Sequence, residues 1–208
     1  MRPSRTITIF AVTATAGTAL VLGPRIASGE GVFGGDSSVL ASVGAVPSVR
    51  PTVELSNPAA EYQVRNGMNG LVLELPGDDT AIESGVAVQQ WHNLHATDQR
   101  WRIESTGDGD YVTFTNVRSE KVLTVKDDSV TNGAALIQVE PKPGDDTQEW
   151  GLEDAGDGQV WIVNRATGKA VDVPDDDTNR RDGTVIQQWR LQDYAKDQRW
   201  VLVPVAVP

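Results

Sequence analysis

Residues 186–200, IQQWRLQDYAKDQRW, contain two Gln-x-Trp triplets, QQW at 187–189 and QRW at 198–200. The second triplet recurs earlier in the chain, as QRW at 99–101 and QEW at 148–150. Trp101, Trp150 and Trp200 are therefore separated by 49 and 50 residues. A fixed period of this length is typical of a repeat architecture. The doubled triplet is thus part of a longer unit that occurs three times.

An asparagine and a strand-like triplet mark the earlier part of each unit. Asn66, Asn116 and Asn164 each stand eight residues before the centre of a triplet, LEL at 73–75, LTV at 123–125 or VDV at 171–173. Apolar outer residues around a less apolar centre predict a half-buried strand. Each triplet runs into an Asp-rich turn: GDDT at 77–80, DDS at 127–129 and DDDT at 175–178.

The units are joined by Asp-Gly pairs at 108–109 and 157–158, which are hairpin signals because both residue types tolerate positive φ. We therefore expect three repeats, at about residues 60–105, 110–154 and 159–204, each with about four short strands. No stretch from Tyr62 to Val203 shows a helical period with caps, so the predicted class is all-β. A propeller needs at least about four blades, so three repeats favour a closed barrel with pseudo-three-fold symmetry. Trp101, Trp150 and Trp200 should lie in its shared core.

Composition narrows the functional classes. The chain has 208 residues, which suits one domain of ordinary size, and no cysteine, which excludes disulfides, thiolate zinc sites and cysteine nucleophiles. Its formal charge of −11 argues against a nucleic-acid partner, because phosphate neutralisation by Lys and Arg supplies most of that affinity.

The N-terminal sequence predicts export. Arg2 and Arg5 precede a mostly apolar run at 7–22, and small residues follow at 27–29, so residues 1–29 are predicted to be a signal peptide. A transmembrane anchor is the alternative, but the run is shorter than the roughly 18 to 20 residues that a spanning helix needs. Residues 30–58, rich in Gly, Ser, Val, Ala and Pro, are predicted to be a disordered tether, followed by one domain at 59–208. We expect a secreted, extracellular monomer that has no membrane segment once the signal peptide is removed.

The Asn, the strand triplet and the Gln-x-Trp triplets together resemble the ricin B-chain-type lectin domain over about residues 60–204. The resemblance implies a β-trefoil and a non-catalytic, carbohydrate-binding function, as in modules found on secreted bacterial glycosidases. In that family each repeat can hold one shallow sugar site. The Asp of the strand triplet accepts hydrogen bonds from sugar hydroxyls, and the aromatic residue of the first Gln-x-Trp stacks on the ring. The second triplet supplies a core tryptophan and supporting polar groups.

The chemistry of such a site is reasonable on its own terms. A pyranose has an apolar C–H face that suits an aromatic ring and a hydroxyl edge that suits carboxylates and amides. The resemblance assigns the third repeat an anchor, a stacking platform and three supporting residues: Asp172, Trp189, Gln187, Asp197 and Gln198. The family often has Asn where this chain has Asp197, which leaves the role of Asp197 open. Trp189 could instead be a partly buried packing residue.

The first repeat matches at Gln89, Trp91, Asp98 and Gln99, but its anchor is Glu74, so a weakened or retuned site is expected. In the middle repeat Thr124 replaces the acid, and Glu140 is expected where the platform tryptophan stands in the other repeats. The middle site is therefore predicted to be lost.

Other readings of the same residues remain open. The Asp-rich turns could contribute oxygens to calcium, although the Asp-x-Asp-x-Asp-Gly spacing of a calcium loop is absent. The acidic pairs Glu74 with Asp98 and Asp172 with Asp197 could act as a glycosidase acid and base, although the resemblance gives these positions to binding. His92 and His95 are expected at the rim of the first site and not in a metal centre, and no cofactor is predicted.

The functional alternative is a secreted trefoil that binds protein, as an inhibitor or surface module. A third reading is an accessory module for a separate enzyme. Galactose-type and xylose-type sugars both remain candidates for a carbohydrate partner.

Overall fold

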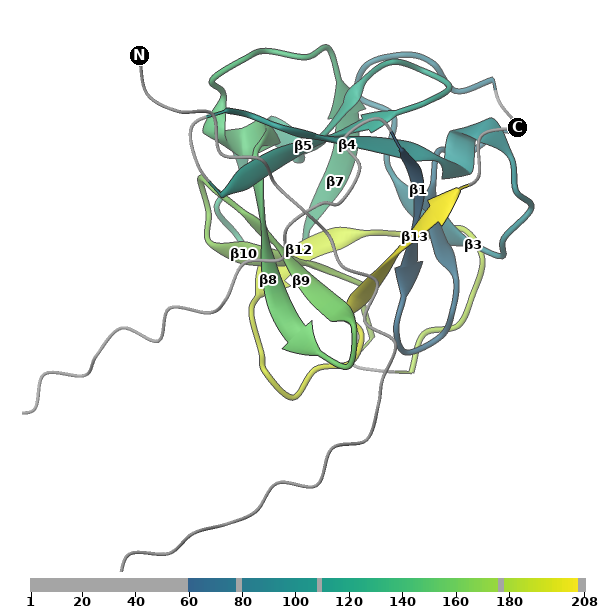
Figure 1. The fold of residues 1–208 in the computed structure, drawn as a ribbon, viewed down its shortest axis with the longest axis vertical. Helices are drawn as coiled ribbons and strands as arrows, with labels where there is room; N and C mark the ends of the chain where they lie inside the picture. Colours follow the sequence, from purple (N-terminus) through teal and green to yellow (C-terminus); the bar gives the residue numbers. More distant parts are fainter. Residues whose placement is uncertain (1–59, 78–79, 108–109, 176–177, 206–208) are drawn as a thin grey trace, which may run out of the picture. The chain divides into compact units, whose positions relative to one another are not determined.

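The computed structural model describes residues 60–77, 80–107, 110–175 and 178–205 (Figure 1). The predicted signal peptide and tether lie outside these residues, as do the Asp108-Gly109 pair and the middle of the first and third Asp-rich turns. Within the described ranges there are thirteen strands: β1 (Glu61–Asn66), β2 (Val72–Glu74), β3 (Gln89–Trp91), β4 (Trp101–Ser105), β5 (Tyr111–Asn116), β6 (Val122–Val125), β7 (Ala134–Val139), β8 (Trp150–Gly156), β9 (Gln159–Asn164), β10 (Lys169–Asp172), β11 (Thr184–Val185), β12 (Gln187–Arg190) and β13 (Trp200–Val205).

The helical content of these ranges is three single 3₁₀ turns, η1 (Thr97–Gln99), η2 (Lys126–Asp128) and η3 (Asp146–Gln148). The all-β prediction is confirmed. No helix in the part of the chain that the structure describes is long and apolar enough to cross a membrane.

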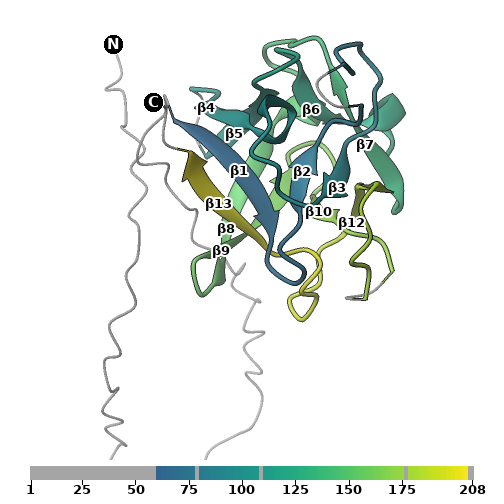
Figure 2. The same ribbon diagram turned by 90° about the vertical axis from the view of Figure 1, so that its right-hand side faces the viewer.

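Six strands close into a barrel. Going round it, β1 pairs with β4, β4 with β5, β5 with β8, β8 with β9, β9 with β13, and β13 with β1 again. The last pairing joins the first and last strands of the domain, which lie side by side in both views (Figure 1 and Figure 2). Each strand is therefore hydrogen-bonded on both sides, so the barrel itself leaves no open sheet edge.

The tryptophan of each repeat is paired with the asparagine of the repeat beside it. Trp101 stands opposite Asn116, Trp150 opposite Asn164, and Trp200 opposite Asn66. The two sequence markers that reveal the repeat are thus partners in the β-ladders that join one repeat to the next. This register gives the barrel its three-fold pattern.

The three tryptophans form the centre of the core, as predicted. Trp101, Trp150 and Trp200 are each 0% exposed. Each indole Nε1 donates a hydrogen bond to the backbone carbonyl of the first residue of its own strand triplet, at 3.0 to 3.1 Å. Burial of each indole ring is favourable, because its apolar surface is removed from water while its N–H group keeps a hydrogen-bond acceptor.

The three asparagines tie the repeats together through their side chains as well. The Nδ2 groups of Asn66, Asn116 and Asn164 donate to the carbonyls of Asp197, Asp98 and Thr147, each at 2.8 Å. Each Oδ1 accepts backbone N–H groups two and three residues further on, at 3.0 to 3.3 Å. One buried amide thus shapes the turn after its own strand and fixes the neighbouring repeat.

Three hairpins stand beside the barrel and carry the strand triplets: β2 with β3, β6 with β7, and β10 with β12. The turn between β8 and β9 has the predicted Asp157-Gly158 pair with φ of 55° and 72°, the geometry of a tight two-residue hairpin.

The centres of the strand triplets depart from the expected alternation. Glu74, Thr124 and Asp172 are only 6%, 4% and 4% exposed, so the triplets are buried on both faces. The outer residues face the core, and the centre residue faces a second layer of polar side chains instead of solvent. Periodicity alone could not reveal that layer, because it comes from glutamines distant in the sequence.

Candidate functional site

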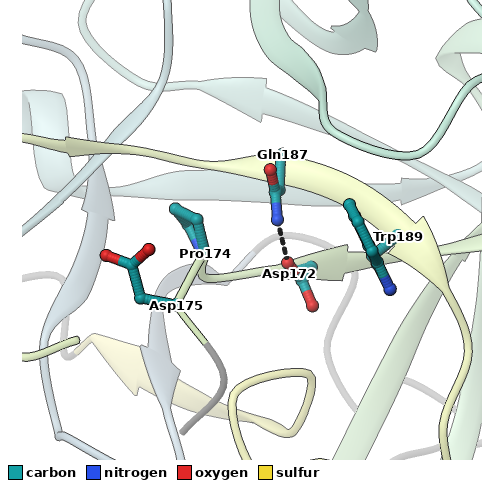
Figure 3. A pocket seen from close by; sticks show the side chains of 5 residues that line it. All are labelled: Asp172, Pro174, Asp175, Gln187 and Trp189. Carbon is teal, nitrogen blue, oxygen red and sulfur yellow. Dashed lines mark hydrogen bonds between the residues drawn. The ribbon is translucent and has the colours of Figure 1, made fainter. Parts of the chain in front are cut away.

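A shallow pocket opens on the third repeat. It has a volume of about 320 Å³ and is lined by Asp172, Pro174, Asp175, Gln187 and Trp189 (Figure 3). The hairpin register brings three of these together, because β10 and β12 place Asp172 opposite Gln187 and Ala170 opposite Trp189. In Figure 3 Trp189 and Asp175 stand on opposite sides of Asp172. The pocket thus combines an aromatic wall, an acidic floor and an acidic lip.

Two glutamine amides hold the Asp172 carboxylate. Gln187 Nε2 donates to Oδ1 at 2.6 Å, and Gln198 Nε2 donates to Oδ2 at 3.0 Å. Gln198 is itself 0% exposed and also donates to the Arg190 carbonyl at 3.0 Å. The two amides therefore fix the position of the Asp172 carboxylate, which lines the pocket beside Trp189.

The first repeat reproduces this arrangement around Glu74. Gln89 Nε2 donates to its Oε1 at 2.7 Å and Gln99 Nε2 to its Oε2 at 2.8 Å. Trp91 lies opposite Val72 on the hairpin, as Trp189 lies opposite Ala170. The longer glutamate side chain is thus accommodated with the same two amide donors.

Burial raises the pKa of the Glu74 carboxyl above its ordinary value of 4.5. The two glutamine amides oppose that shift, while the nearby carboxylates of Asp98 and Asp182 add to it. The proton is favoured because a buried negative charge loses its hydration and is repelled by its neighbours.

Asp98 and Asp197 are buried to about the same degree as the carboxylates of Glu74 and Asp172. Each is 4% exposed, and Asp197 is not among the residues that line the pocket. Their backbone carbonyls accept the side-chain amides of Asn116 and Asn66. The structure therefore places the backbone of both residues where the repeats join, and Asp197 outside the lining of the third-repeat pocket.

The middle repeat lacks the anchor carboxylate, its first glutamine partner and the platform tryptophan of the other two sites. On the β6–β7 hairpin, Ile137 stands opposite Thr124 and Val139 stands opposite Val122. Ile137 thus occupies the position of Gln89 and Gln187, and Val139 that of the two platform tryptophans. At these positions the hairpin therefore does not present the carboxylate, the amide and the aromatic ring that line the other two sites.

The predicted placement of Glu140 at the platform position is wrong by one residue. Gln148 donates to the Glu140 carbonyl at 3.1 Å, as Gln99 does to His92 and Gln198 to Arg190. Glu140 is therefore the counterpart of the residue that follows each platform. The error arises because the first repeat has one residue fewer between its two triplets, so that counting back from Trp150 shifts the comparison.

A family model described as "Ricin-type beta-trefoil lectin domain-like" matches the chain at residues 52–139, 110–189 and 146–206. The chain belongs to this lectin family. The match confirms the resemblance inferred from the repeats and supports carbohydrate binding in general.

Solved structures confirm that this lectin domain is a β-trefoil. A designed three-fold symmetric protein, ThreeFoil, is 30% identical with a TM-score of 0.65, over 70% of this chain and 99% of that one. The exo-β-1,3-galactanase 1,3Gal43A from Clostridium thermocellum is 32% identical with a TM-score of 0.65, over 74% of this chain and 32% of that longer one. A ricin B-like lectin from Macrolepiota procera, solved with lactose, shares the fold at 20% identity and a TM-score of 0.59, over 71% and 96% of the two chains. No curated protein matches the chain.

Three buried glutamines of the lectin domain escaped the sequence analysis. Gln90, Gln138 and Gln188 occupy equivalent hairpin positions and are each 0% exposed. Each Nε2 donates to backbone carbonyls of a loop from another repeat: Arg181 for Gln90, Ala81 and Glu83 for Gln138, and Ser129 and Thr131 for Gln188. The sequence signal that could have revealed two of them is the central Gln that recurs in QQW at 89–91 and 187–189.

Two of these loops border the platform tryptophans of the two candidate sites. A Cβ atom added to Gly183 would lie 3.4 Å from Cζ3 of Trp91, and one added to Gly133 would lie 3.7 Å from Cζ3 of Trp189. Both glycines have positive φ, which suits glycine in any case. The first-repeat site is therefore completed by the third repeat, and the third-repeat site by the middle one.

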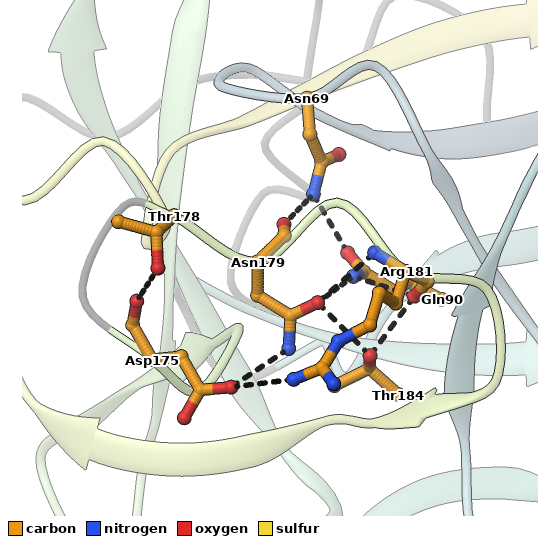
Figure 4. Close-up of polar contacts among 7 residues, drawn as sticks. All are labelled: Asn69, Gln90, Asp175, Thr178, Asn179, Arg181 and Thr184. Atoms are coloured by element: carbon orange, nitrogen blue, oxygen red, sulfur yellow. Dashed lines mark hydrogen bonds and ion pairs between the residues drawn. The ribbon is translucent and has the colours of Figure 1, made fainter.

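A polar network organises the loop that serves both sites (Figure 4). The buried Asn179 donates through Nδ2 to Asp175 at 3.3 Å and accepts the Arg181 N–H at 3.0 Å. Arg181 Nη2 also lies 3.3 Å from the Asp175 carboxylate, and Asn69 of the first repeat donates to the Asn179 carbonyl at 2.9 Å. The loop thus runs from the lip of the third-repeat pocket to the rim of the first-repeat site.

The raised pKa of Glu74 predicts how Glu74→Gln changes the pH dependence of stability. A carboxyl whose folded-state pKa is raised stabilises the fold below its unfolded pKa, and this contribution is lost as pH rises through the folded value. Because glutamine does not titrate, the free energy of unfolding of the variant should fall less than that of the wild type as pH rises from 4.5. Urea unfolding across a pH series measures this. Glu104→Gln, at an exposed position, controls for the loss of one negative charge; parallel profiles for wild type and Glu74→Gln would contradict the prediction.

Proposed function

We propose that this lectin domain binds carbohydrate through two shallow sites, one in the third repeat and one in the first, and that the middle repeat has lost its site. The observation that carries the proposal is the Asp172 carboxylate, which two amides hold beside the partly exposed Trp189 in an open pocket. Membership of the lectin family supports carbohydrate binding in general.

The proposed roles follow from the chemistry of a sugar ring. Its C–H face would stack on Trp189, and its hydroxyl edge would face Asp172 and Gln187. A charged acceptor makes stronger hydrogen bonds to hydroxyls than a neutral one, so Asp172 is the anchor. Gln198 acts through the anchor, to which it donates, and Asp197 acts through its backbone carbonyl, since neither residue lines the pocket. Trp91, Glu74 and Gln89 take the corresponding roles in the first repeat, backed by Gln99 and Asp98.

The two sites favour a polymeric ligand. Each site alone offers few groups to a sugar, and two sites on one rigid body raise the apparent affinity for a chain that reaches both. A 32% identical relative is an exo-β-1,3-galactanase, so β-1,3-galactan is the first polysaccharide to test, with xylan as the second.

A binding role without catalysis fits these carboxylates better than glycoside hydrolysis. Hydrolysis needs two carboxyl groups that flank the scissile bond, and of the pair Asp172 and Asp197 only Asp172 lines the pocket. Domains of this family are generally non-catalytic. The apolar run at 7–22 and the small residues at 27–29 favour a protein that acts outside the cell.

Retention on immobilised polysaccharides tests the proposal. The wild-type protein should be retained on β-1,3-galactan or xylan and released by the free sugar. In the presence of Trp91→Ala, which isolates the third repeat, Asp172→Asn should weaken binding about 10-fold, because a charge-assisted hydrogen bond becomes a neutral one. Asp175→Asn, at the exposed lip of the same pocket, is the matched control and should have a smaller effect.

The opposite outcome points to the other functional class. A folded wild-type protein that is retained on no plant, fungal or bacterial polysaccharide would overturn the proposal and favour a protein partner.

A further inference from the structure

The residue after each platform differs between the two proposed sites in a way that the fold does not require. It is His92 in the first repeat and Arg190 in the third. In both repeats its backbone N–H donates to a side-chain oxygen of a loop from another repeat, Asp182 Oδ1 at 2.8 Å and Asn132 Oδ1 at 3.0 Å. This backbone bond is the shared structural element. The side chains of His92 and Arg190, in contrast, differ between the two sites.

In the first repeat, the His92 side chain also contacts Asp182. His92 Nδ1 lies 2.7 Å from Asp182 Oδ2, so Asp182 binds both the backbone and the ring of one residue. A carboxylate is an acceptor only, so the hydrogen of this bond lies on Nδ1, and Nε2 remains for another partner. The His92 side chain is 54% exposed and Asp182 is 35% exposed. The ring is thus held in one orientation while much of it faces solvent.

The His92 ring continues the Trp91 platform. The two ring centroids are 5.8 Å apart, and the ring planes are tilted by 30°. Gly183, next to Asp182, presents no side chain to the edge of Trp91, where a Cβ would approach Cζ3 to 3.4 Å. The two neighbouring rings therefore form one surface. The loop that borders this surface has a glycine, Gly183, where it comes closest to Trp91.

We propose that His92 gives the first-repeat site a second sugar subsite, so that this site binds a two-unit segment of a glycan. The inference rests on the proposed carbohydrate-binding function. With one sugar stacked on Trp91, the next sugar of the chain lies over His92, and Nε2 exchanges a hydrogen bond with one of its hydroxyls. Because Asp182 already fixes the ring, little side-chain entropy is lost on binding. The third repeat, with a flexible Arg190 at this position, binds one unit.

The test compares a monosaccharide with its disaccharide in a protein that keeps only the first-repeat site, the full chain with Trp189→Ala. Titration calorimetry with galactose and β-1,3-galactobiose, and with xylose and xylobiose, gives the gain in affinity from the second unit. His92→Ala should reduce that gain by about 2- to 10-fold, the size of one aromatic contact, and leave the monosaccharide affinity unchanged.

Two further proteins provide matched comparisons. His92→Arg with Asp182→Asn copies the pair found in the third repeat and should lower the gain as His92→Ala does. Arg190→Ala, in a chain where Trp91→Ala leaves only the third-repeat site, should not change the gain.

The possible failures are distinct. An unchanged gain in His92→Ala, or an equal loss of monosaccharide and disaccharide affinity, overturns the second subsite and leaves the proposed function standing. Binding by the Trp91→Ala chain but not by the Trp189→Ala chain removes the first-repeat site altogether. Absence of binding by the wild-type protein overturns the proposed function as well.

Discussion

Replacing Trp200 by alanine should lower the free energy of unfolding by about 3 to 5 kcal/mol. The ring is 0% exposed, its Nε1 donates to the Val171 carbonyl at 3.0 Å, and its backbone pairs with Asn66 across the joint between the last and first repeats. Truncation would leave a large cavity and remove the hydrogen bond to the Val171 carbonyl. Since a domain is commonly stable by only about 5 to 15 kcal/mol, much of the protein would unfold on mild heating.

Urea unfolding followed by tryptophan fluorescence and circular dichroism measures this loss. Trp200→Phe is the control, because it keeps most of the apolar volume but not the indole donor, and it should cost less than Trp200→Ala. A loss below about 1 kcal/mol in Trp200→Ala, the size of an average substitution, would show that the three-fold tryptophan set does not hold the core.

Replacing Trp189 by alanine should have the reverse profile. The ring forms the wall of an open pocket and is only partly buried, so the free energy of unfolding should change by about 1 kcal/mol or less. Affinity of the third-repeat site for its glycan should fall about 30-fold or more, as expected when an aromatic anchor at the centre of an interface is removed.

Binding is measured with Trp91→Ala present in both proteins, so that only the third-repeat site reports. Val139→Ala, at the platform position of the middle repeat, is the control and should leave binding unchanged. Equal losses of stability in Trp189→Ala and Trp200→Ala would remove Trp189 from the site and return it to the core.

The repeat and its core were predictable because their signals are local or strictly periodic. Trp101, Trp150 and Trp200 recur at a nearly fixed spacing, and the Asn markers and strand triplets recur with them. The structure confirms the all-β class, the three-fold barrel and the burial of these tryptophans. The spacing could not show that each tryptophan pairs with the asparagine of another repeat. A repeat period does not specify which repeats contact each other.

The details of the sites were harder to predict for two physical reasons. A loop shortened by one residue displaced the comparison in the middle repeat, so that Glu140 was aligned in place of Val139. The rim contacts join residues distant in sequence, such as His92 with Asp182 and Arg190 with Asn132. Gln90, Gln138 and Gln188 were also missed. Their partners are backbone carbonyls of distant loops, and every residue type has such a carbonyl, so the sequence does not identify these partners.

The middle repeat contributes a loop to the candidate site of the third repeat. The middle repeat lacks an anchor and a platform, yet Asn132 caps the Arg190 N–H and Gly133 lies beside the Trp189 ring. Its loop around η2 is held there by Gln188 of the third repeat. Under the proposed function, a sequence change in the middle repeat is therefore expected to alter ligand choice at the third-repeat site without changing any residue of the third repeat. Replacing the middle repeat with a generic trefoil repeat would change the surroundings of that candidate site.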